Sequence, residues 1–402
     1  MNVIHITEWM LWIFMAPSVL YVAFYALVSL FPSRTAKHQP STLSHQPSSF
    51  LILFPAYKED SVIVHSVRQC LEQTYPKDFY HIGVISDHMQ DDTNELLRQL
   101  PITLFTPQFE KSSKAKAMQY AIKEINGQSS MVNGQSSIVN GQFDYVIILD
   151  ADNVVLPDFL EQVNASCQQG YRAIQCHRCA KNSDNDVAVL DGVSEEINNT
   201  LFRKAHNMIG ISSALIGSGM CFEFEWFKNH VGLFETAVED REMEIQLMKE
   251  HIFIKYEEHI PVYDEKVSNS ENFQRQRLRW MTGQIQSLLM MLPYLPIAIK
   301  TGNIHYIDKT MQQALIPRSI LLVLTCFFAI LMTIIAFPWS IKWWVLFLVI
   351  CLSIYIAIPR KMRNSALFGK IFSTIKLVWL MLKNILKMDL KNKEFLHTTH
   401  GK

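Results

Sequence analysis

Hydrophobic positions divide the chain into two kinds of region. An uncharged apolar run at residues 9–31 is long enough to cross a hydrocarbon core of about 30 Å, which predicts a transmembrane helix. Two more apolar runs, at 319–337 and 343–358, are joined by PWSIK and predict a transmembrane hairpin. Between 49 and 261, short apolar strands alternate with helical stretches, a pattern typical of a mainly parallel α/β sheet with crossover helices.

The expected strands of this sheet are short and rich in β-branched and aromatic residues. They lie at 50–54, 81–86, 102–105, 145–149 and 172–176. A tandem repeat, NGQSSMV then NGQSSIV at 126–139, has the Gly, Asn and Ser content of an exposed loop and is assigned no chemistry. From residue 371, apolar residues keep helical spacing but lysines interrupt them, which favours an amphipathic interfacial helix over a fourth span.

Basic residues flank the apolar runs on one side. Arg34 and Lys37 follow the first run, and Arg360, Lys361 and Arg363 follow the hairpin, so the positive-inside rule places these ends in the cytoplasm. We therefore expect an integral protein of the plasma or inner membrane whose α/β domain is cytoplasmic. The expected parts are a transmembrane helix (1–34), a linker (35–48), the α/β domain (49–270), interfacial helices (271–318), the hairpin (319–359) and a cytoplasmic amphipathic helix with a tail (360–402).

Composition narrows the classes of partner. The formal net charge is +0, which argues against a nucleic-acid binder because phosphate neutralisation needs a basic excess. The 7 cysteines are an odd number at scattered positions, which does not indicate a disulfide framework. Cys176 and Cys179 form a CHRC pair, but no second pair at zinc-ligand spacing accompanies it.

Acidic residues stand where the strand at 145–149 ends. Asp150 and Asp152 follow YVIIL, and open α/β sheets place their chemistry at the carboxyl ends of strands. On a strand, both side chains would point to the same side of the pleat and could share one cation. The alternative is that they only solvate the strand end and cap the next element.

Other candidates also stand at the ends of predicted elements. Asp87 ends a strand and could accept hydrogen bonds from a base or ribose, or belong to a helix cap. Lys114 begins a helix, where a nearby anion such as a diphosphate would offset the unfavourable dipole, although an exposed lysine fits as well. Glu239 and Asp240 open another helix, a good place for a base, and capping is the alternative.

Two further segments favour ligand contact. Gly217 and Gly219 flank Ser218, so backbone could approach a ligand closely there. Residues 272–280, NFQRQRLRW, combine three arginines with Trp280, and this helix could instead lie on anionic lipid headgroups.

In their order along the chain, these segments resemble the family 2 glycosyltransferases, and most of all the membrane-anchored, cellulose-synthase-like members that use nucleotide sugars. The resemblance covers about residues 49–285 and implies a GT-A fold and a metal-dependent hexosyltransferase with Mg²⁺ or Mn²⁺. It implies donor contacts, probable only by analogy, from Tyr57, Glu59, Asp87, Lys114 and Asp150; metal ligation by Asp150 and Asp152; and Asp240 as catalytic base, although Val238 replaces the usual threonine.

The resemblance extends to the acceptor side and the tail. Gln276, Arg279 and Trp280 match a Q-x-x-R-W motif, and the implied acceptor or diphosphate set is Gly217, Ser218, Gly219, Glu239, Gln276, Arg277, Arg279 and Trp280. FLHTTH at 395–400 resembles a gating segment through Phe395, Thr398 and His400, with His397 and His400 standing where the family has valine and lysine.

One base and no assigned nucleophile predict a single displacement that inverts the anomeric centre. The expected donor is a UDP-sugar, and the acceptor is a growing polysaccharide or other glycan. Membrane lipid and an export partner are the other expected partners, and no nucleic acid is expected. The alternatives are transfer of one sugar to a lipid, an aspartyl-phosphate phosphatase using the DAD stretch, and an inactive membrane scaffold. Neither the sugar nor the linkage follows from the sequence.

Overall fold

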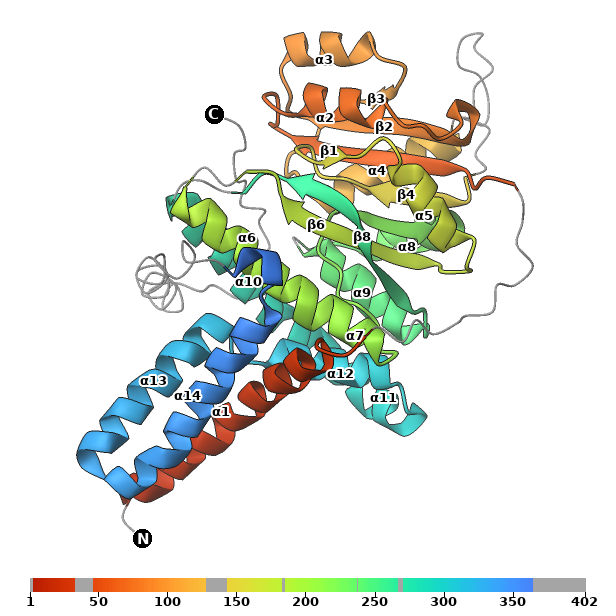
Figure 1. Cartoon of the computed structure of the whole chain (residues 1–402). Helices are drawn as coiled ribbons and strands as arrows, with labels where there is room; N and C mark the ends of the chain where they lie inside the picture. The colour runs from red at the N-terminus through yellow and green to blue at the C-terminus, as the bar shows by residue number, and fades with distance from the viewer. Residues whose placement is uncertain are drawn as a thin grey trace. The chain divides into compact units, whose positions relative to one another are not determined.

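The computed structural model describes residues 3–32, 46–127, 143–182, 185–236, 238–266 and 270–363 (Figure 1). These residues form two compact units. The sheet unit takes in the described residues of Ala36–Ser183 and Ser212–Val267. The helical unit takes in those of Met1–Thr35, Asp184–Ile211 and Ser268–Leu390.

The sheet unit is built on an 8-stranded sheet in the order β3-β2-β1-β4-β7-β6-β8-β5. Strands β1 to β4 run parallel, β7 is antiparallel to β4 and β6, β6 and β8 are parallel, and β5 is antiparallel to β8. The sheet is therefore mixed, whereas the sequence predicted a mainly parallel one. The strands are β1 (Phe50–Tyr57), β2 (Tyr80–Asp87), β3 (Thr103–Phe105), β4 (Tyr145–Ile148), β5 (Val154–Val155), β6 (Ala173–Ala180), β7 (Met220–Glu223) and β8 (Ile254–Asp264).

Alternation along β1 explains how helices cover the sheet. Phe50, Ile52 and Phe54 are fully buried and share one cluster with Ile63 and Val67 of α2. Each large apolar side chain buried in this way contributes about 1.5–3 kcal/mol. Helix α4 packs on β1 and β2, and α8 packs on β4 and β7. The helices of this unit are α2 (Ile63–Cys70), α3 (Asp91–Arg98), α4 (Lys114–Gly127), α5 (Phe159–Cys167), α8 (Phe224–His230) and α9 (Glu239–Lys249).

Strands β6 and β8 change register part-way along their pairing. Residues 258–260 of β8 have no counterpart on β6. After them, Arg178 lies opposite Val262, so Asp264 is the diagonal neighbour of Arg178 on the next strand. Diagonal neighbours on one face are within reach of long side chains.

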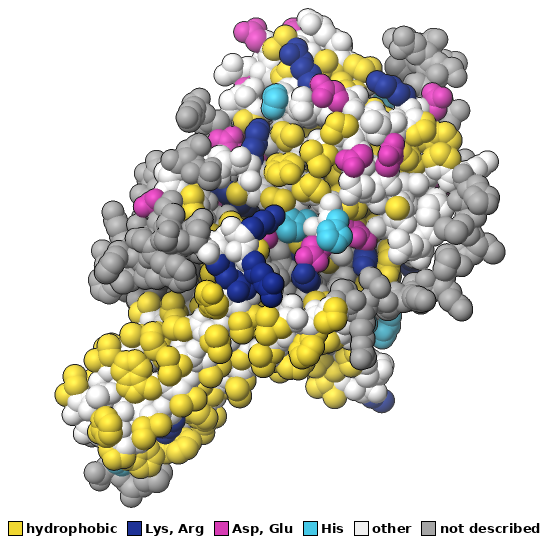
Figure 2. Space-filling model, in the orientation of Figure 1, with side chains coloured by type: hydrophobic (Ala, Val, Ile, Leu, Met, Phe, Trp, Pro, Cys, Tyr) yellow, Lys and Arg dark blue, Asp and Glu magenta, His cyan; other side chains and the backbone are white. Residues whose placement is uncertain are grey.

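Three helices of the helical unit are long and apolar enough to cross a membrane: α1 (Val3–Val28), α13 (Arg318–Ile335) and α14 (Phe337–Ala357). Their outward side chains are mostly hydrophobic, as Figure 2 shows. Only Ala336 separates α13 from α14, so PWSIK begins a helix and is not the turn that the sequence predicted. Pro338 fits there because the first helical turn needs no N–H donor from it.

The rest of the helical unit consists of shorter helices. They are α6 (Asp186–Asn198), the π-helical turn η2 (Asn199–Lys204), α7 (Ala205–Met208), α10 (Ser270–Met291), α11 (Leu295–Thr301) and α12 (Ile304–Ala314). The predicted amphipathic helix from residue 371 and the predicted gating residues Phe395, Thr398 and His400 lie outside the described residues.

A charged pair joins the first and last apolar helices. Lys342 of α14 lies 2.8 Å from Glu8 of α1, and its ammonium is 3.4 Å from the ring centroid of Trp9. Trp343 donates a hydrogen bond of 2.5 Å to the same carboxylate. A buried charge is stable in an apolar setting when it is paired and hydrogen-bonded in this way.

Candidate functional site

The two acidic residues after β4 lie in a turn. Strand β4 ends at Ile148, so the strand pleat assumed from the sequence does not orient Asp150 and Asp152. Instead, the Asp150 N–H donates to Asn153 Oδ1 (2.9 Å) and the Asn153 N–H donates to the Asp150 carbonyl (3.0 Å). These bonds leave the Asp150 side chain one-third exposed and bury Asp152.

The Asp152 carboxylate is tied to the end of β8. Its Oδ2 accepts from the Glu265 N–H at 2.8 Å, and its Oδ1 accepts from the Asn153 side chain at 3.2 Å. Each carboxylate oxygen can accept more than one bond, so Asp152 keeps capacity for a ligand. Carboxylates are the hard oxygen donors that Mg²⁺ and Mn²⁺ prefer, and the donor types of Asp150 and Asp152 therefore fit such an ion.

Lys114 is the central cation of this edge of the sheet. It is the first residue of α4, and its ammonium contacts Asp150 Oδ1 and the Gly217 carbonyl (2.5 Å). Glu239 Oε1 lies 3.9 Å away. Burial would lower the pKa of Lys114, but the nearby carboxylates, above all Asp150, raise it. The lysine is therefore held charged where a helix start alone would disfavour a cation.

Glu239 and Asp240 begin α9 beside this lysine. Burial, and to a lesser degree the Asp240 carboxylate, raise the pKa of Glu239 to about 7, although Lys114 acts in the opposite direction. A Cβ atom added at Gly217 would lie 3.6 Å from Asp240 Oδ2, so this backbone lies against the Asp240 carboxylate. One lysine and three carboxylates thus meet around one short loop.

That loop, residues 216–219, needs its glycines. Gly217 has φ +83° and Gly219 has φ +63°, a left-handed conformation that other residues rarely adopt. The Gly219 N–H donates to the Ile148 carbonyl at 2.9 Å, which ties the loop to the end of β4. Ser218 is fully buried, and its hydroxyl has no hydrogen-bond partner among the described residues.

The predicted nucleotide contacts lie at the ends of β1 and β2. Tyr57 is half-buried, and Asp87 and Glu59 are buried. His88, which the sequence did not single out, lies 2.6 Å from Asp87 Oδ1 through its Nδ1. Lys58 and His88 both have positive φ values, +55° and +57°. Non-glycine residues in this conformation cluster at functional sites, and no feature of the sequence marks them.

The Q-x-x-R-W residues belong to α10 in the helical unit. Gln276 is buried, and Arg277, Arg279 and Trp280 are half-buried. Within this unit, Arg277 bonds Asp191 of α6 at 2.6 Å and its guanidinium lies 4.6 Å from the Trp280 ring centroid. The structure thus describes the motif inside its own unit, and its predicted acceptor role stays a prediction.

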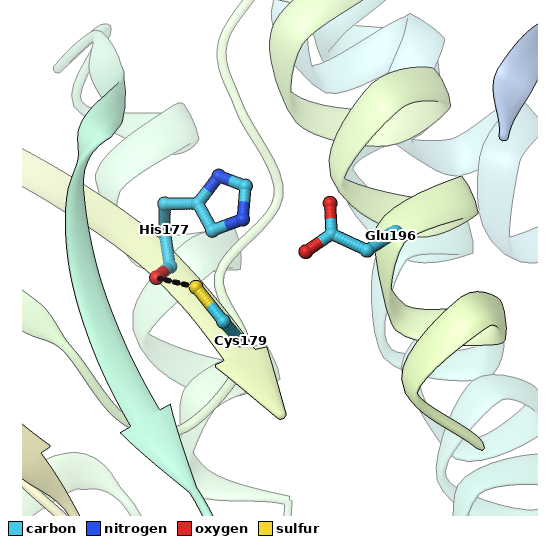
Figure 3. Close-up of side chains that lie close together, drawn as sticks. All are labelled: His177, Cys179 and Glu196. Carbon is cyan, nitrogen blue, oxygen red and sulfur yellow. Dashed lines mark hydrogen bonds between the residues drawn. The ribbon is translucent and has the colours of Figure 1, made fainter. Parts of the chain in front are cut away.

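The CHRC stretch forms the end of β6. Figure 3 shows the Cys179 thiol directed at the His177 carbonyl oxygen, a contact of 3.4 Å. The His177 Nδ1 lies 2.8 Å from the Tyr256 hydroxyl of β8. Glu196, also drawn in Figure 3, comes from α6 of the helical unit. His177 and Cys179 therefore have strand contacts of their own within the sheet unit.

Comparison with known proteins identifies the family. The sequence profile described as "Glycosyltransferase like family 2" matches residues 47–283, more than half of the 402 residues. The chain belongs to this family. The mixed sheet of this glycosyltransferase-like chain is that of the GT-A glycosyltransferases, which confirms the predicted fold class. The search of curated proteins found no match.

Solved structures resemble this family member at low sequence identity. The mannosyltransferase PcManGT from Pyrobaculum calidifontis, in complex with GDP-Man and Mn²⁺, is 14% identical with a TM-score of 0.52, covering 94% of this chain and 100% of that chain. S. aureus TarS 1-349 in complex with UDP-GlcNAc is 10% identical, with a TM-score of 0.41 and coverage of 85% and 92%. At these identities, the first match shows the fold of a glycosyltransferase and no more.

Sequence reasoning missed three residues that organise the site of this glycosyltransferase-like chain. They are Arg178, Asp264 and Glu265, at the ends of β6 and β8. Their contacts depend on the register between the two strands, and β8 was not among the predicted strands. The long alternation of buried and half-buried positions in β8 is the signal that would have revealed it.

Proposed function

We propose that this protein is an inverting glycosyltransferase of the cellulose-synthase-like type that uses a UDP-sugar. The observation that carries the proposal is the contact of Lys114 with Asp150 and Gly217, beside Glu239 and Asp240. A lysine among carboxylates at a sheet edge suits a diphosphate that must leave and a hydroxyl that must lose a proton. The similar mannosyltransferase, solved with GDP-Man and Mn²⁺, supports a nucleotide sugar and a divalent cation.

In the proposed reaction, Lys114 binds the diphosphate and offsets the charge that develops as the glycosidic bond to phosphate breaks. Asp240 accepts the proton of the acceptor hydroxyl, which attacks from the opposite face of the sugar. Tyr57, Glu59 and Asp87 hold the nucleoside. Asp150 and Asp152 would hold Mg²⁺ or Mn²⁺, which when bound neutralises charge on the leaving diphosphate.

We propose that Gly217–Gly219, Glu239 and the helix residues Gln276, Arg277, Arg279 and Trp280 serve the acceptor and the diphosphate. The acceptor is a growing polysaccharide or other glycan, and a lipid-linked acceptor is the second candidate. The three apolar helices and the basic residues at their ends support a membrane protein whose sheet unit is cytoplasmic. The boundaries predicted from the sequence remain part of this proposal.

The test uses the full chain in lipid nanodiscs with UDP- and GDP-sugars and Mg²⁺ or Mn²⁺. Asp240→Asn should lower the rate of nucleotide release by roughly 10²–10⁴ and leave donor binding, measured by calorimetry, unchanged. Glu225→Gln, an exposed carboxylate on α8, is the control and should keep the wild-type rate. Sizing of the product separates polymer from single transfer.

Two results would contradict the proposal. One is that no nucleotide sugar binds with either metal present, which would favour an inactive scaffold. The other is that Asp240→Asn turns over donor at the wild-type rate, which would place the base elsewhere.

A further inference from the structure

The loop at 216–219 is held by side chains of β6. The buried Gln175 accepts from the Ile216 N–H (3.0 Å) and donates to the carbonyls of Ser218 (2.9 Å) and Gly219 (3.3 Å). Arg178 donates through Nη1 to the Ile216 carbonyl at 3.2 Å. Both peptide groups that flank Ile216 are therefore fixed from the neighbouring strand.

Arg178 is itself fixed by a buried carboxylate. Its Nε and Nη2 both bond Asp264 Oδ2, at 2.7 and 2.5 Å, and the Asp264 side chain is only 2% exposed. A guanidinium can make these bonds and the bond to Ile216 together because its donors are fixed in one plane. Lys266 is the second cation on Asp264, at 2.9 Å, and no bond joins its side chain to the loop among the contacts described here.

The loop in turn meets the groups proposed to act on the substrate. The peptide bond after the Ile216 carbonyl leads directly into Gly217, whose carbonyl accepts from Lys114 at 2.5 Å. The Gly217 backbone also lies against Asp240. A shift of the loop would therefore move an oxygen partner of Lys114 and the surface beside Asp240 together.

We propose that Arg178 is a positioning residue for glycosyl transfer: anchored by Asp264, it fixes the 216–219 loop so that Gly217 holds Lys114 and lies against Asp240. This inference rests on the proposed function. It assigns a role to a residue outside the predicted site set, and the role is exerted through the loop and not by contact with the sugar. A misplacement of about 1 Å can cost roughly 10²-fold in rate, so a small change in this support should be measurable.

Arg178 could also act through its charge, since Lys114 first and Arg178 second lower the pKa of Asp150 against the opposing effect of burial. Arg178→Lys separates the two routes. It keeps the positive charge, but an ammonium lacks the planar fork that bonds Asp264 and Ile216 at once. The matched control is Lys266→Gln, which removes the other cation from Asp264 and leaves Arg178 in place.

Two measurements on full-length protein in nanodiscs decide the proposal. The first is amide hydrogen exchange of the peptide covering 215–220, which needs no turnover. We expect exchange to rise at least roughly tenfold in Arg178→Lys and to stay at the wild-type rate in Lys266→Gln. The second is steady-state transfer, where we expect kcat to fall roughly 10- to 100-fold in Arg178→Lys with the donor KM within about threefold.

The outcomes are distinct from those that test the function itself. Unchanged exchange in Arg178→Lys overturns the proposal, whatever the activity. Equal losses of kcat in Arg178→Lys and Lys266→Gln also overturn it, because they would mean that Asp264 only stabilises the fold. Wild-type kcat in Arg178→Lys with loosened exchange overturns the link to catalysis. A wild-type protein that turns over no nucleotide sugar defeats the proposed function and the catalytic half of this inference together, and exchange then still decides whether Arg178 holds the loop.

Discussion

Replacing Glu239 by glutamine should make stability less dependent on pH. The Glu239 side chain is 9% exposed, and burial, followed by the Asp240 carboxylate, raises its pKa from 4.5 to about 7. One pH unit of difference between folded and unfolded pKa is worth about 1.4 kcal/mol. The ionised carboxylate therefore costs the folded protein about 3 kcal/mol above pH 7, and glutamine, which resembles the protonated acid, removes this cost.

The sign follows from proton binding. Between pH 4.5 and about 7, the folded protein keeps a proton that the unfolded chain has lost, so wild-type stability from this group falls as pH rises. Near pH 4.5 the two proteins should be about equally stable. Above pH 7 Glu239→Gln should be more stable by about 3 kcal/mol, a rise in Tm of about 6–12 °C for a domain of this size.

The direct assay is infrared difference spectroscopy of wild type minus Glu239→Gln. The protonated carboxyl band should disappear with a midpoint near pH 7, and thermal unfolding across the same range should diverge in parallel. Glu225→Gln, which changes an exposed carboxylate, should show no such divergence. A constant difference in Tm between wild type and Glu239→Gln from about pH 5 to pH 8 would refute the reasoning, because it would show that Glu239 ionises at its ordinary pKa.

Two further predictions concern the loop and the apolar helices. Gly219→Ala should lower stability by about 1–3 kcal/mol, because φ is +63° and the new Cβ would lie 3.0 Å from Val262 Cγ2; Gly210→Ala, with φ +78° and open space around it, is the control, and equal losses in the two would contradict the clash. Glu8→Gln should lower thermal stability in detergent by about 3–5 kcal/mol because it leaves Lys342 unpaired, and Glu8→Gln with Lys342→Met should recover most of it; no recovery would mean that the pair itself is not the cause.

Periodicity predicted the elements whose pattern is local. The strands at 50–54 and 145–149 are continuous apolar runs, and the three apolar helices are long, so all were visible in the sequence. β7 and β8 were not predicted, and both depend on pairing with β6 across long separations. Because strand propensity depends on the neighbouring strand, the antiparallel junctions of a mixed sheet leave little trace in the sequence.

The site shows the same division. Acidic residues at the ends of elements are a local signal, and the sequence singled out Asp150, Lys114 and Asp240 on that basis. How they are oriented was not predictable, since Asp150 is placed by a turn through Asn153 and Lys114 by the Gly217 carbonyl. Arg178 could not be recognised at all, because only its contacts distinguish it from any other charged residue near a strand end.

The three unmatched residues of β8, 258–260, act as a spacer that sets the reach of the strand. A strand rises about 3.3 Å per residue, so deleting them would draw Asp264 back by about 10 Å. An odd shift would also turn its side chain to the other face of the sheet. A designer who trimmed this irregularity would gain an uninterrupted ladder and lose the anchor of Arg178, which shows that a flaw in sheet geometry can be a requirement of the active edge.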